Sequence, residues 1–163
     1  MGKNANSRRA VPYRATQPKR SSAQASVALD ALNGHLGYFI RRAQIWVFQD
    51  FIRTLRPVDL SPAEYSVLVV TGANRGLSQA ELAATLAIER ARLVRLLHRL
   101  EERGLLQRLP SSADGRRHAL QLTPPGRTTL ARAKALAARH EQGLRTRLGA
   151  ERHKLLLAAL RDF

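Results

Sequence analysis

Residues 78–126 restrict the possible folds of this chain more than any other stretch. Ser78 and Glu81 have the spacing of a capping box, in which the serine oxygen accepts a hydrogen bond from the Glu81 backbone and the glutamate accepts one from the serine backbone. Leu82 and Leu86 follow four residues apart, so they lie on one side of a helix. This pattern predicts a first helix of about eight residues.

A second, basic helix is expected to follow a turn at Ala87–Ile88. It runs from about Glu89 to Arg103, where Gly104 supplies the left-handed conformation of a C-cap. Its buried side is expected to hold Leu93, Leu96, Leu97 and Leu100. The remaining positions that we consider for contact with DNA are Arg90, Ala91, Arg92, Val94, Arg95, His98 and Arg99. A basic N-terminal half suits a helix in the major groove of DNA, because its first turns meet base edges and phosphates. The alternative is a solvated basic face on an ordinary core helix.

A hairpin with a basic tip favours the DNA-binding alternative. Residues 105–109 and 118–122 alternate well enough to pair as strands, and Asp114-Gly115 between them is a strong turn signal. Arg116 and Arg117 would project from the tip, where they can enter a narrow minor groove of high negative potential. The fold class predicted from these residues is mainly α, a winged helix-turn-helix with a two-stranded β wing.

The segments LSQAELAATLAI, LVRLLHRLEERGLLQR and DGRRHALQLTPPG occur in this order, and the chain resembles the MarR family of winged-helix transcriptional regulators over roughly residues 29–163. The resemblance implies that Arg116 inserts into the minor groove and that Asp114 braces the wing by pairing with an arginine. Two positions depart from the family pattern: Ala87 stands where glycine is frequent, and Glu89 where serine or threonine is usual.

The net charge of +16 indicates an anionic partner, with nucleic acid first and an anionic membrane or acidic ligand next. The chain has no cysteine, which excludes disulfides, thiolate metal sites and the thiol-based peroxide sensing of some MarR proteins. Neither a transmembrane run nor a signal-peptide core is evident, so we expect a cytoplasmic protein without membrane contact.

We expect two regions along the chain. Residues 1–26 are basic, contain no acidic residue and form a disordered arm, which is either a solubilising tail or a contact for DNA phosphates or an anionic effector. Residues 27–163 form the MarR-like domain, with the winged helix-turn-helix at about 61–122. Ser61 with Glu64 predicts a further helix start there.

Long helices are expected to form a homodimer. The predicted helix over residues 29–55 has apolar residues on two sides, and a second subunit is the simplest cover for both. Helices over 124–161, divided at Gly149, would complete these dimerisation elements. A dimer presents two recognition helices one DNA turn apart.

Nothing in the sequence indicates an enzyme. The five histidines have no metal-ligand spacing, and no phosphate-binding or nucleophile motif occurs, so neither metal nor cofactor is expected.

The sensing site implied by the resemblance lies between the dimerisation helices and the DNA-binding lobe. The effector candidates there are His35, Tyr38, Phe39, Arg42, Trp46 and Tyr65. Aromatic walls with arginine suit an anionic aromatic effector, either an aromatic acid or its CoA thioester. Alternatively, Phe39 and Trp46 belong to the dimer core and Arg42 is solvated. The function expected is a repressor that binds a pseudo-palindromic operator and is released by this effector. The competing hypothesis is an architectural nucleic-acid-binding winged-helix protein without regulation.

Overall fold

The computed structural model describes residues 27–110 and 118–162 of the chain, which forms two compact units, Met1–His35 and Leu36–Phe163. In the first unit, a short 3-10 helix, η1, spans Asp30–Gly34. His35 follows in an extended conformation, with φ −94° and ψ 107°. The predicted continuous helix from residue 29 is therefore wrong at its start. Gly34 and Gly37 flank the break, and glycine lowers helix stability because it loses the most backbone entropy on folding.

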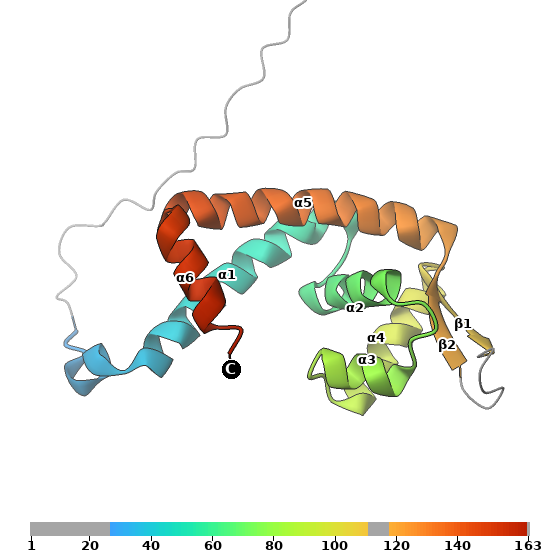
Figure 1. Ribbon diagram of the computed structural model, residues 1–163, viewed down its shortest axis with the longest axis horizontal. Coiled ribbons are helices and arrows are strands. Elements are labelled where there is room, and N and C mark those ends of the chain that lie inside the picture. Colours follow the sequence, from blue (N-terminus) through green and yellow to red (C-terminus); the bar gives the residue numbers. More distant parts are fainter. Residues whose placement is uncertain (1–26, 111–117, 163) are drawn as a thin grey trace, which may run out of the picture. The chain divides into compact units, whose positions relative to one another are not determined.

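The second unit begins with two helices joined by a connection that contains a short 3-10 helix (Figure 1). Helix α1 spans Leu36–Leu55, and a short 3-10 helix, η2, spans Arg56–Val58. Helix α2 spans Pro62–Ala73 and starts with the predicted capping box, since Ser61 and Glu64 exchange both hydrogen bonds.

The helix-turn-helix pair follows as predicted. Helix α3 spans Gln79–Thr85 and begins with a second capping box, formed by Ser78 and Glu81. Helix α4 spans Arg90–Glu102, and the side chain of Glu89 caps it by accepting from the Ala91 backbone at 3.3 Å. The turn between them places Ala87 at φ 49°, a left-handed conformation that is unfavourable for a residue with a Cβ.

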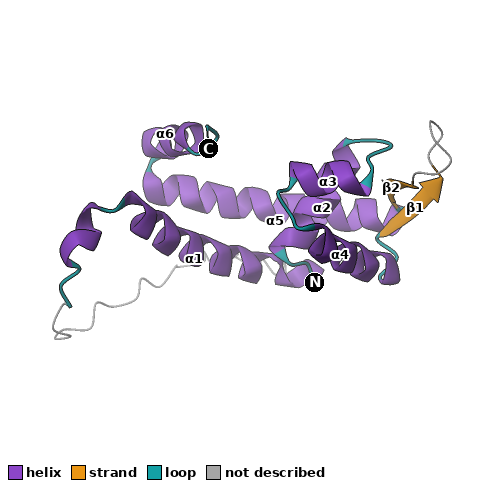
Figure 2. Cartoon of the chain, turned by 90° about the horizontal axis from the view of Figure 1, so that it is seen from below, coloured by secondary structure: helices purple, strands orange, loops and turns teal. Residues whose placement is uncertain are grey.

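Two antiparallel strands form the base of the wing. Strand β1 spans Leu106–Pro110 and β2 spans His118–Leu122, with Leu106 paired to Leu122 (Figure 2). Ahead of α3, the carbonyl of Leu77 accepts a hydrogen bond from the Leu120 backbone at 2.9 Å. This contact attaches the start of the helix-turn-helix pair to the wing.

Helix α5 spans Pro124–Leu148, begins beside the wing and packs against α2 and α1. At its start, Gly126 touches the backbone of Leu105 so closely that a Cβ added there would lie 1.9 Å from the Leu105 carbonyl oxygen. Gly149, at φ 83°, ends α5, and α6 spans Ala150–Ala159.

Leucines from α1 to α5 and from both strands fill a single core. The largest fully buried side chains are Leu55, Val67, Leu68, Leu82, Leu93, Leu97, Leu100 and Leu120. The predicted fold class is confirmed: the unit is mainly α, with four helices, a two-stranded wing and two further helices. No helix in residues 27–110 and 118–162 is both long and apolar enough to cross a membrane.

Candidate functional site

The exposed face of α4 is strongly basic. Its four leucines point inward as predicted, and every residue that we considered for DNA contact on this helix is exposed. No described carboxylate forms an ion pair with Arg90, Arg92 or Arg95. Glu89 caps the helix from its own N-terminus. Three guanidinium groups around the exposed part of this helix are therefore available to an external anion, and Val94 adds an apolar contact with 48% of its surface exposed.

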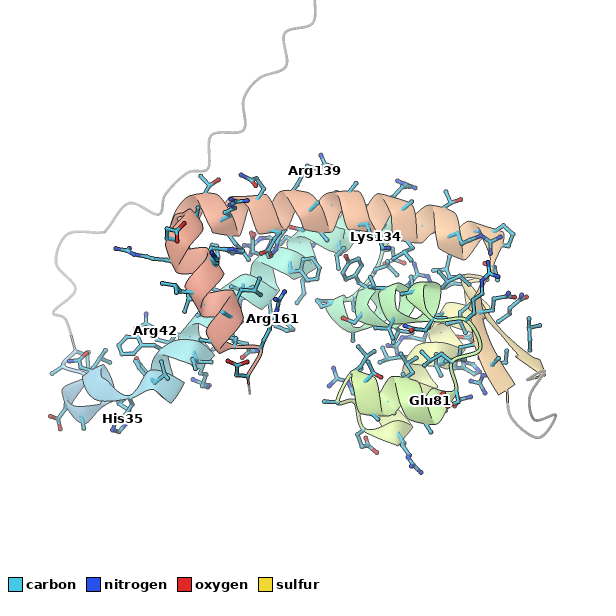
Figure 3. The ribbon with its side chains drawn as sticks, in the orientation of Figure 1. His35, Arg42, Glu81, Lys134, Arg139 and Arg161 are labelled. Carbon is cyan, nitrogen blue, oxygen red and sulfur yellow. The ribbon has the colours of Figure 1, made fainter. Side chains whose placement is uncertain are left out.

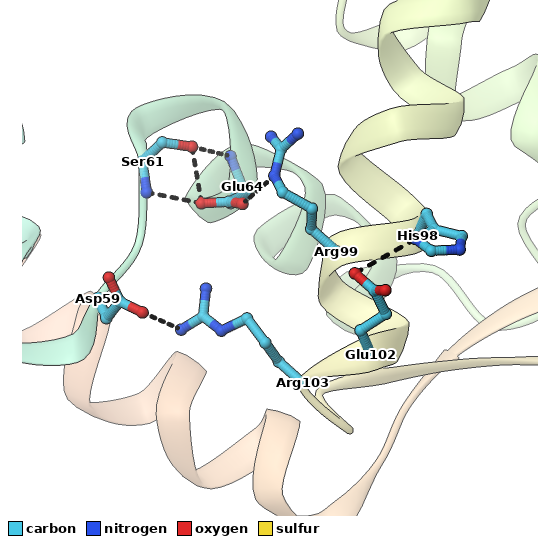
Figure 4. Close-up of polar contacts among 7 residues, drawn as sticks. All are labelled: Asp59, Ser61, Glu64, His98, Arg99, Glu102 and Arg103. Atoms are coloured by element: carbon cyan, nitrogen blue, oxygen red, sulfur yellow. Dashed lines mark hydrogen bonds and ion pairs between the residues drawn. The ribbon is translucent and has the colours of Figure 1, made fainter.

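Two other predicted DNA contacts on α4 have partners within the protein (Figure 4). His98 Nδ1 lies 3.3 Å from a carboxylate oxygen of Glu102, one helical turn further on. Arg99 donates from Nε to Glu64 Oε1 on α2, at 3.2 Å. These two positions therefore differ from the three unpaired arginines, although both side chains remain more than half exposed.

Glu64 is a buried carboxylate that stays ionised. Burial by itself raises its pKa, but hydrogen bonds from the Ser61 backbone and hydroxyl and the pairing with Arg99 outweigh this effect. The net result is a pKa below the ordinary value of a glutamate.

The tip of the wing lies outside the described residues. The predicted minor-groove contacts Arg116 and Arg117 and the predicted wing brace Asp114 all fall in residues 111–117, so these roles stay predictions. At the base of the wing, Arg108 Nε on β1 lies 2.9 Å from Glu101 Oε1 on α4. This ion pair connects the strand that leads to the tip with the basic helix.

A first cavity, of about 490 Å³, lies among α4, α1 and the start of α2. We name it cavity 1. Its lining residues are Phe48, Ile52, Ser61, Pro62, Ala63, Arg92, Arg95, Leu96 and Arg99. It combines three arginines with an apolar wall, which suits an organic anion.

A second cavity, of about 590 Å³, lies among α1, α2 and α5, and we name it cavity 2. Its lining residues are Val47, Phe48, Phe51, Tyr65, Lys134, Ala137, Ala138, His140, Glu141 and Leu144. Figure 3 shows Lys134 on the side of α5 that faces α2, whereas Arg139 lies on the opposite side. Phe48 belongs to both cavities, so one aromatic side chain forms a wall of each.

Aromatic and titratable groups meet in cavity 2. The ring of Phe51 lies edge-on to Tyr65 at 5.5 Å and contacts the His140 ring at 5.0 Å. The His140 side chain is only 6% exposed, and its Nε2 lies 3.4 Å from Asp50 Oδ2 without a hydrogen bond. Burial raises the pKa of the Tyr65 hydroxyl, which therefore remains protonated at neutral pH.

Of the six predicted effector residues, Tyr65 lines cavity 2, and the other five line neither cavity. Tyr38 packs edge-on against Phe39 at 5.3 Å, and the Arg42 guanidinium lies 5.7 Å from the Tyr38 ring. Trp46 is covered by the guanidinium of Arg147, 4.4 Å from its ring.

His35 belongs to the first unit and is not placed relative to the cavities. Within residues 27–110 and 118–162, no group of three His, Cys, Asp or Glu side chains is arranged to hold a metal ion.

Sequence reasoning missed Phe48, Lys134 and His140 as cavity residues. Phe48 stood within the apolar run of the first helix, and His140 was one of several scattered histidines. Only the packing of α5 against α1 and α2 brings them together.

The fold is that of a winged helix-turn-helix DNA-binding protein. Two helices are joined by a turn, the second of them has an exposed basic side, and two antiparallel strands follow. The MarR family model matches residues 58–117. A transcriptional regulatory protein assigned to the hcr operon of Thauera aromatica is 39% identical over 77% of this chain and 77% of its own length. The chain belongs to the MarR family of transcriptional regulators.

Solved structures of the repressor CouR are also similar. CouR bound to a 23-mer DNA duplex superposes with a TM-score of 0.81 at 45% identity, covering 85% of this chain and 98% of CouR. CouR bound to p-coumaroyl-CoA gives a TM-score of 0.77 at 46% identity, covering 83% and 95% respectively.

Proposed function

We propose that this regulator is a homodimeric repressor that binds a pseudo-palindromic operator and is released by an anionic aromatic effector, either an aromatic acid or its CoA thioester. Four observations support this proposal: the apolar surface of the long helices, the basic face of α4, the composition of the two cavities, and the ligands of CouR.

Exposed apolar side chains on α1 and around α6 support the homodimer. The residues in question are Leu36, Phe39, Ile40, Ile45, Trp46, Phe48, Ile52, Leu155, Leu156, Leu157 and Leu160, each between 39% and 68% exposed. An apolar surface of this kind is unfavourable in water and is typical of a protein interface. A second copy presents the same residues, so one two-fold interface covers both sets.

The recognition helix α4 supplies the major-groove contacts in this proposal. Arg90, Arg92 and Arg95 take guanine edges or phosphates, and Ala91 and Val94 contact thymine methyl groups. His98 and Arg99, which already have partners, contribute less. Arg116 and Arg117 of the wing tip enter the minor groove, with Asp114 as the brace.

In this proposal, different parts of one effector molecule occupy the two cavities. The arginines of cavity 1 bind its carboxylate or phosphate groups, and the aromatic walls of cavity 2 bind its ring. Phe48 is common to both cavities, so a single molecule that passes this side chain can occupy both. CouR is a relative that binds p-coumaroyl-CoA, a ligand with both an aromatic acyl group and phosphates.

One observation carries the proposal: Arg92 and Arg95 line cavity 1 and also belong to the exposed basic face of α4. The same guanidinium groups cannot pair fully with DNA and with a bound anion at once. The two ligands therefore compete, and each lowers the affinity for the other by the same factor.

The test is a titration of the protein against a labelled fragment of its own upstream region, with excess random DNA present. p-Coumaroyl-CoA, free p-coumarate and free coenzyme A are then added separately to the complex. We expect binding that resists competition and is released by the thioester at lower concentrations than by either half. Arg92→Lys keeps the positive charge in cavity 1 but removes the planar guanidinium that can donate two parallel hydrogen bonds to an anion. This variant should raise the thioester concentration needed for release.

Other outcomes have distinct meanings. Binding no tighter than to random DNA would favour the architectural alternative. Tight binding that no aromatic acid or thioester releases would support the DNA-binding repressor but refute the proposed class of effector. A sedimentation experiment that shows a monomer at the concentrations used would refute the homodimer.

A further inference from the structure

The buried carboxylate of Glu64 makes one contact that helix capping does not need. Its Oε2 accepts from the Ser61 backbone N–H at 2.8 Å and from the Ser61 hydroxyl at 2.8 Å, while Oε1 accepts from Arg99. Ser78 makes the same two contacts with Glu81 at the start of α3, at 2.8 Å and 2.7 Å. The Ser61 contacts are those of a capping box, and the pairing of Glu64 with Arg99 on α4 is an additional contact between two helices.

The geometry of this pairing leaves most of the Arg99 guanidinium available. Glu64 binds Nε, and no described residue binds either terminal nitrogen. In Figure 4 both terminal nitrogens point away from the Glu64 carboxylate. The guanidinium is planar and rigid, so a hydrogen bond at Nε restrains the orientation of the whole group. Arg99 lines cavity 1, so the hydrogen bond from Glu64 restrains the orientation of a guanidinium group in the wall of that cavity.

We propose that Glu64 is a positioning residue that holds Arg99 with its two terminal nitrogens ready for a phosphate or carboxylate group in cavity 1. The proposal rests on the proposed function only in taking cavity 1 as the anion-binding part of the effector site. Glu64 does not touch the ligand. It acts by removing the rotational freedom that a solvated arginine side chain would otherwise lose on binding.

The positioning role and simple electrostatics predict opposite effects on anion affinity when the charge of Glu64 is removed. A carboxylate beside the cavity lowers its positive potential, so removing the charge by Glu64→Gln should strengthen anion binding if charge alone mattered. If positioning dominates, the same substitution weakens binding, because the glutamine amide cannot accept from both Ser61 and Arg99.

Asp59 offers a matched control. Its carboxylate pairs with Arg103 at 3.3 Å and joins the segment before α2 to α4, as Glu64 does, but it is 94% exposed and lines neither cavity. Asp59→Asn removes the same charge from the same neighbourhood. Asparagine also tolerates the left-handed backbone at this position, φ 50°.

The experiment measures the binding of coenzyme A to the full-length wild-type protein, Glu64→Gln and Asp59→Asn by calorimetry at one ionic strength. We expect Glu64→Gln to weaken binding by up to about tenfold, the range for loss of one preorganised side chain. Asp59→Asn should leave it unchanged or slightly tighter. Equal or tighter binding by Glu64→Gln would overturn the proposal.

Two further measurements separate positioning from a general structural effect. In an Arg99→Lys background the charge remains but the Nε contact is gone, so Glu64→Gln should cause no additional loss; an equal loss there would overturn the proposal. If coenzyme A fails to bind the wild type, cavity 1 is not its site and that part of the proposed function fails. The solvent-exchange rate of the Arg99 Nε–H, followed by NMR, then decides: slower exchange in the wild type than in Glu64→Gln supports positioning, and equal rates overturn it.

Discussion

Replacing Gly126 by alanine tests the contact between the start of α5 and the backbone that precedes the wing. The added Cβ would lie 1.9 Å from the carbonyl oxygen of Leu105 and 2.8 Å from its carbonyl carbon. An ordinary contact is about 3.5 Å, so α5 and Leu105 must separate by roughly 1.6 Å. Both partners are backbone, so no side chain can rotate out of the way.

The structure sets the expected magnitude of this change. Separation breaks the hydrogen bond from the Thr123 backbone to Leu105 at 3.2 Å and weakens that from the Thr123 hydroxyl to Gly104 at 2.6 Å. Each hydrogen bond contributes about 1 kcal/mol. Overpacking adds about 1–3 kcal/mol. We expect a total loss of about 2–5 kcal/mol in the free energy of unfolding, or a fall in Tm of about 10 °C.

Gly143, in the same helix, provides the control, because a Cβ added there meets nothing within 4 Å. Gly143→Ala should stabilise the protein by about 0.5–1 kcal/mol, since glycine is the poorer helix former. Urea and thermal unfolding of both variants at one protein concentration provide the measurement, because the proposed dimerisation would make Tm depend on concentration. A loss below about 1 kcal/mol for Gly126→Ala, or an equal loss for Gly143→Ala, would refute the reasoning.

Four further predictions concern the turn, acid stability and two DNA contacts. Ala87→Gly should raise stability by about 0.5–1 kcal/mol, because the left-handed backbone disfavours a Cβ; a lower Tm than wild type would contradict this strain. Because the folded-state pKa of Glu64 lies below its ordinary 4.5, its contribution to stability is complete above about pH 4.5 and disappears as the pH falls through the lower value. Urea unfolding from about pH 6 to pH 3 should therefore show a smaller loss for Glu64→Gln than for wild type, and parallel curves would argue against an ionised native carboxylate. Arg95→Ala should reduce operator affinity by about 10- to 100-fold and relax sequence preference, whereas Arg116→Ala should weaken binding with little effect on folding. Equal losses of Arg95→Ala on operator and random DNA would show that it contacts only phosphate, and unchanged affinity of Arg116→Ala would contradict the wing contact.

The helix starts were predictable because their signals are local. Ser61 with Glu64, and Ser78 with Glu81, lie three residues apart, so each capping box can be recognised without knowledge of the rest of the fold. The same holds for the buried leucines of α4, which follow one helical period. The helix start at residue 29 was predicted wrongly because the apolar period continued through Gly34 and His35, where the chain leaves the helical conformation.

The cavities were not predictable from such signals. The contact between Glu64 and Arg99 joins residues 35 positions apart, and that between Trp46 and Arg147 joins two helices at opposite ends of the chain. Aromatic composition placed Trp46 among the effector candidates, and its stacking with Arg147 of α5 could not be foreseen from the sequence. Tyr65 was placed among the effector candidates, and it lines cavity 2. Its contacts with α1 and α5 depend on tertiary packing.

The length of α5 converts a small rotation of this helix into a large displacement of its far end. Its 25 residues span about 37 Å, from the contact of Gly126 beside the wing to the pairing of Arg147 with Trp46 at the other end. A rotation of only about 5° about one end displaces the other by roughly 3 Å, which is close to the rise of one base pair. In the proposed repressor, a rotation of this size would displace a recognition helix by about one step on the DNA.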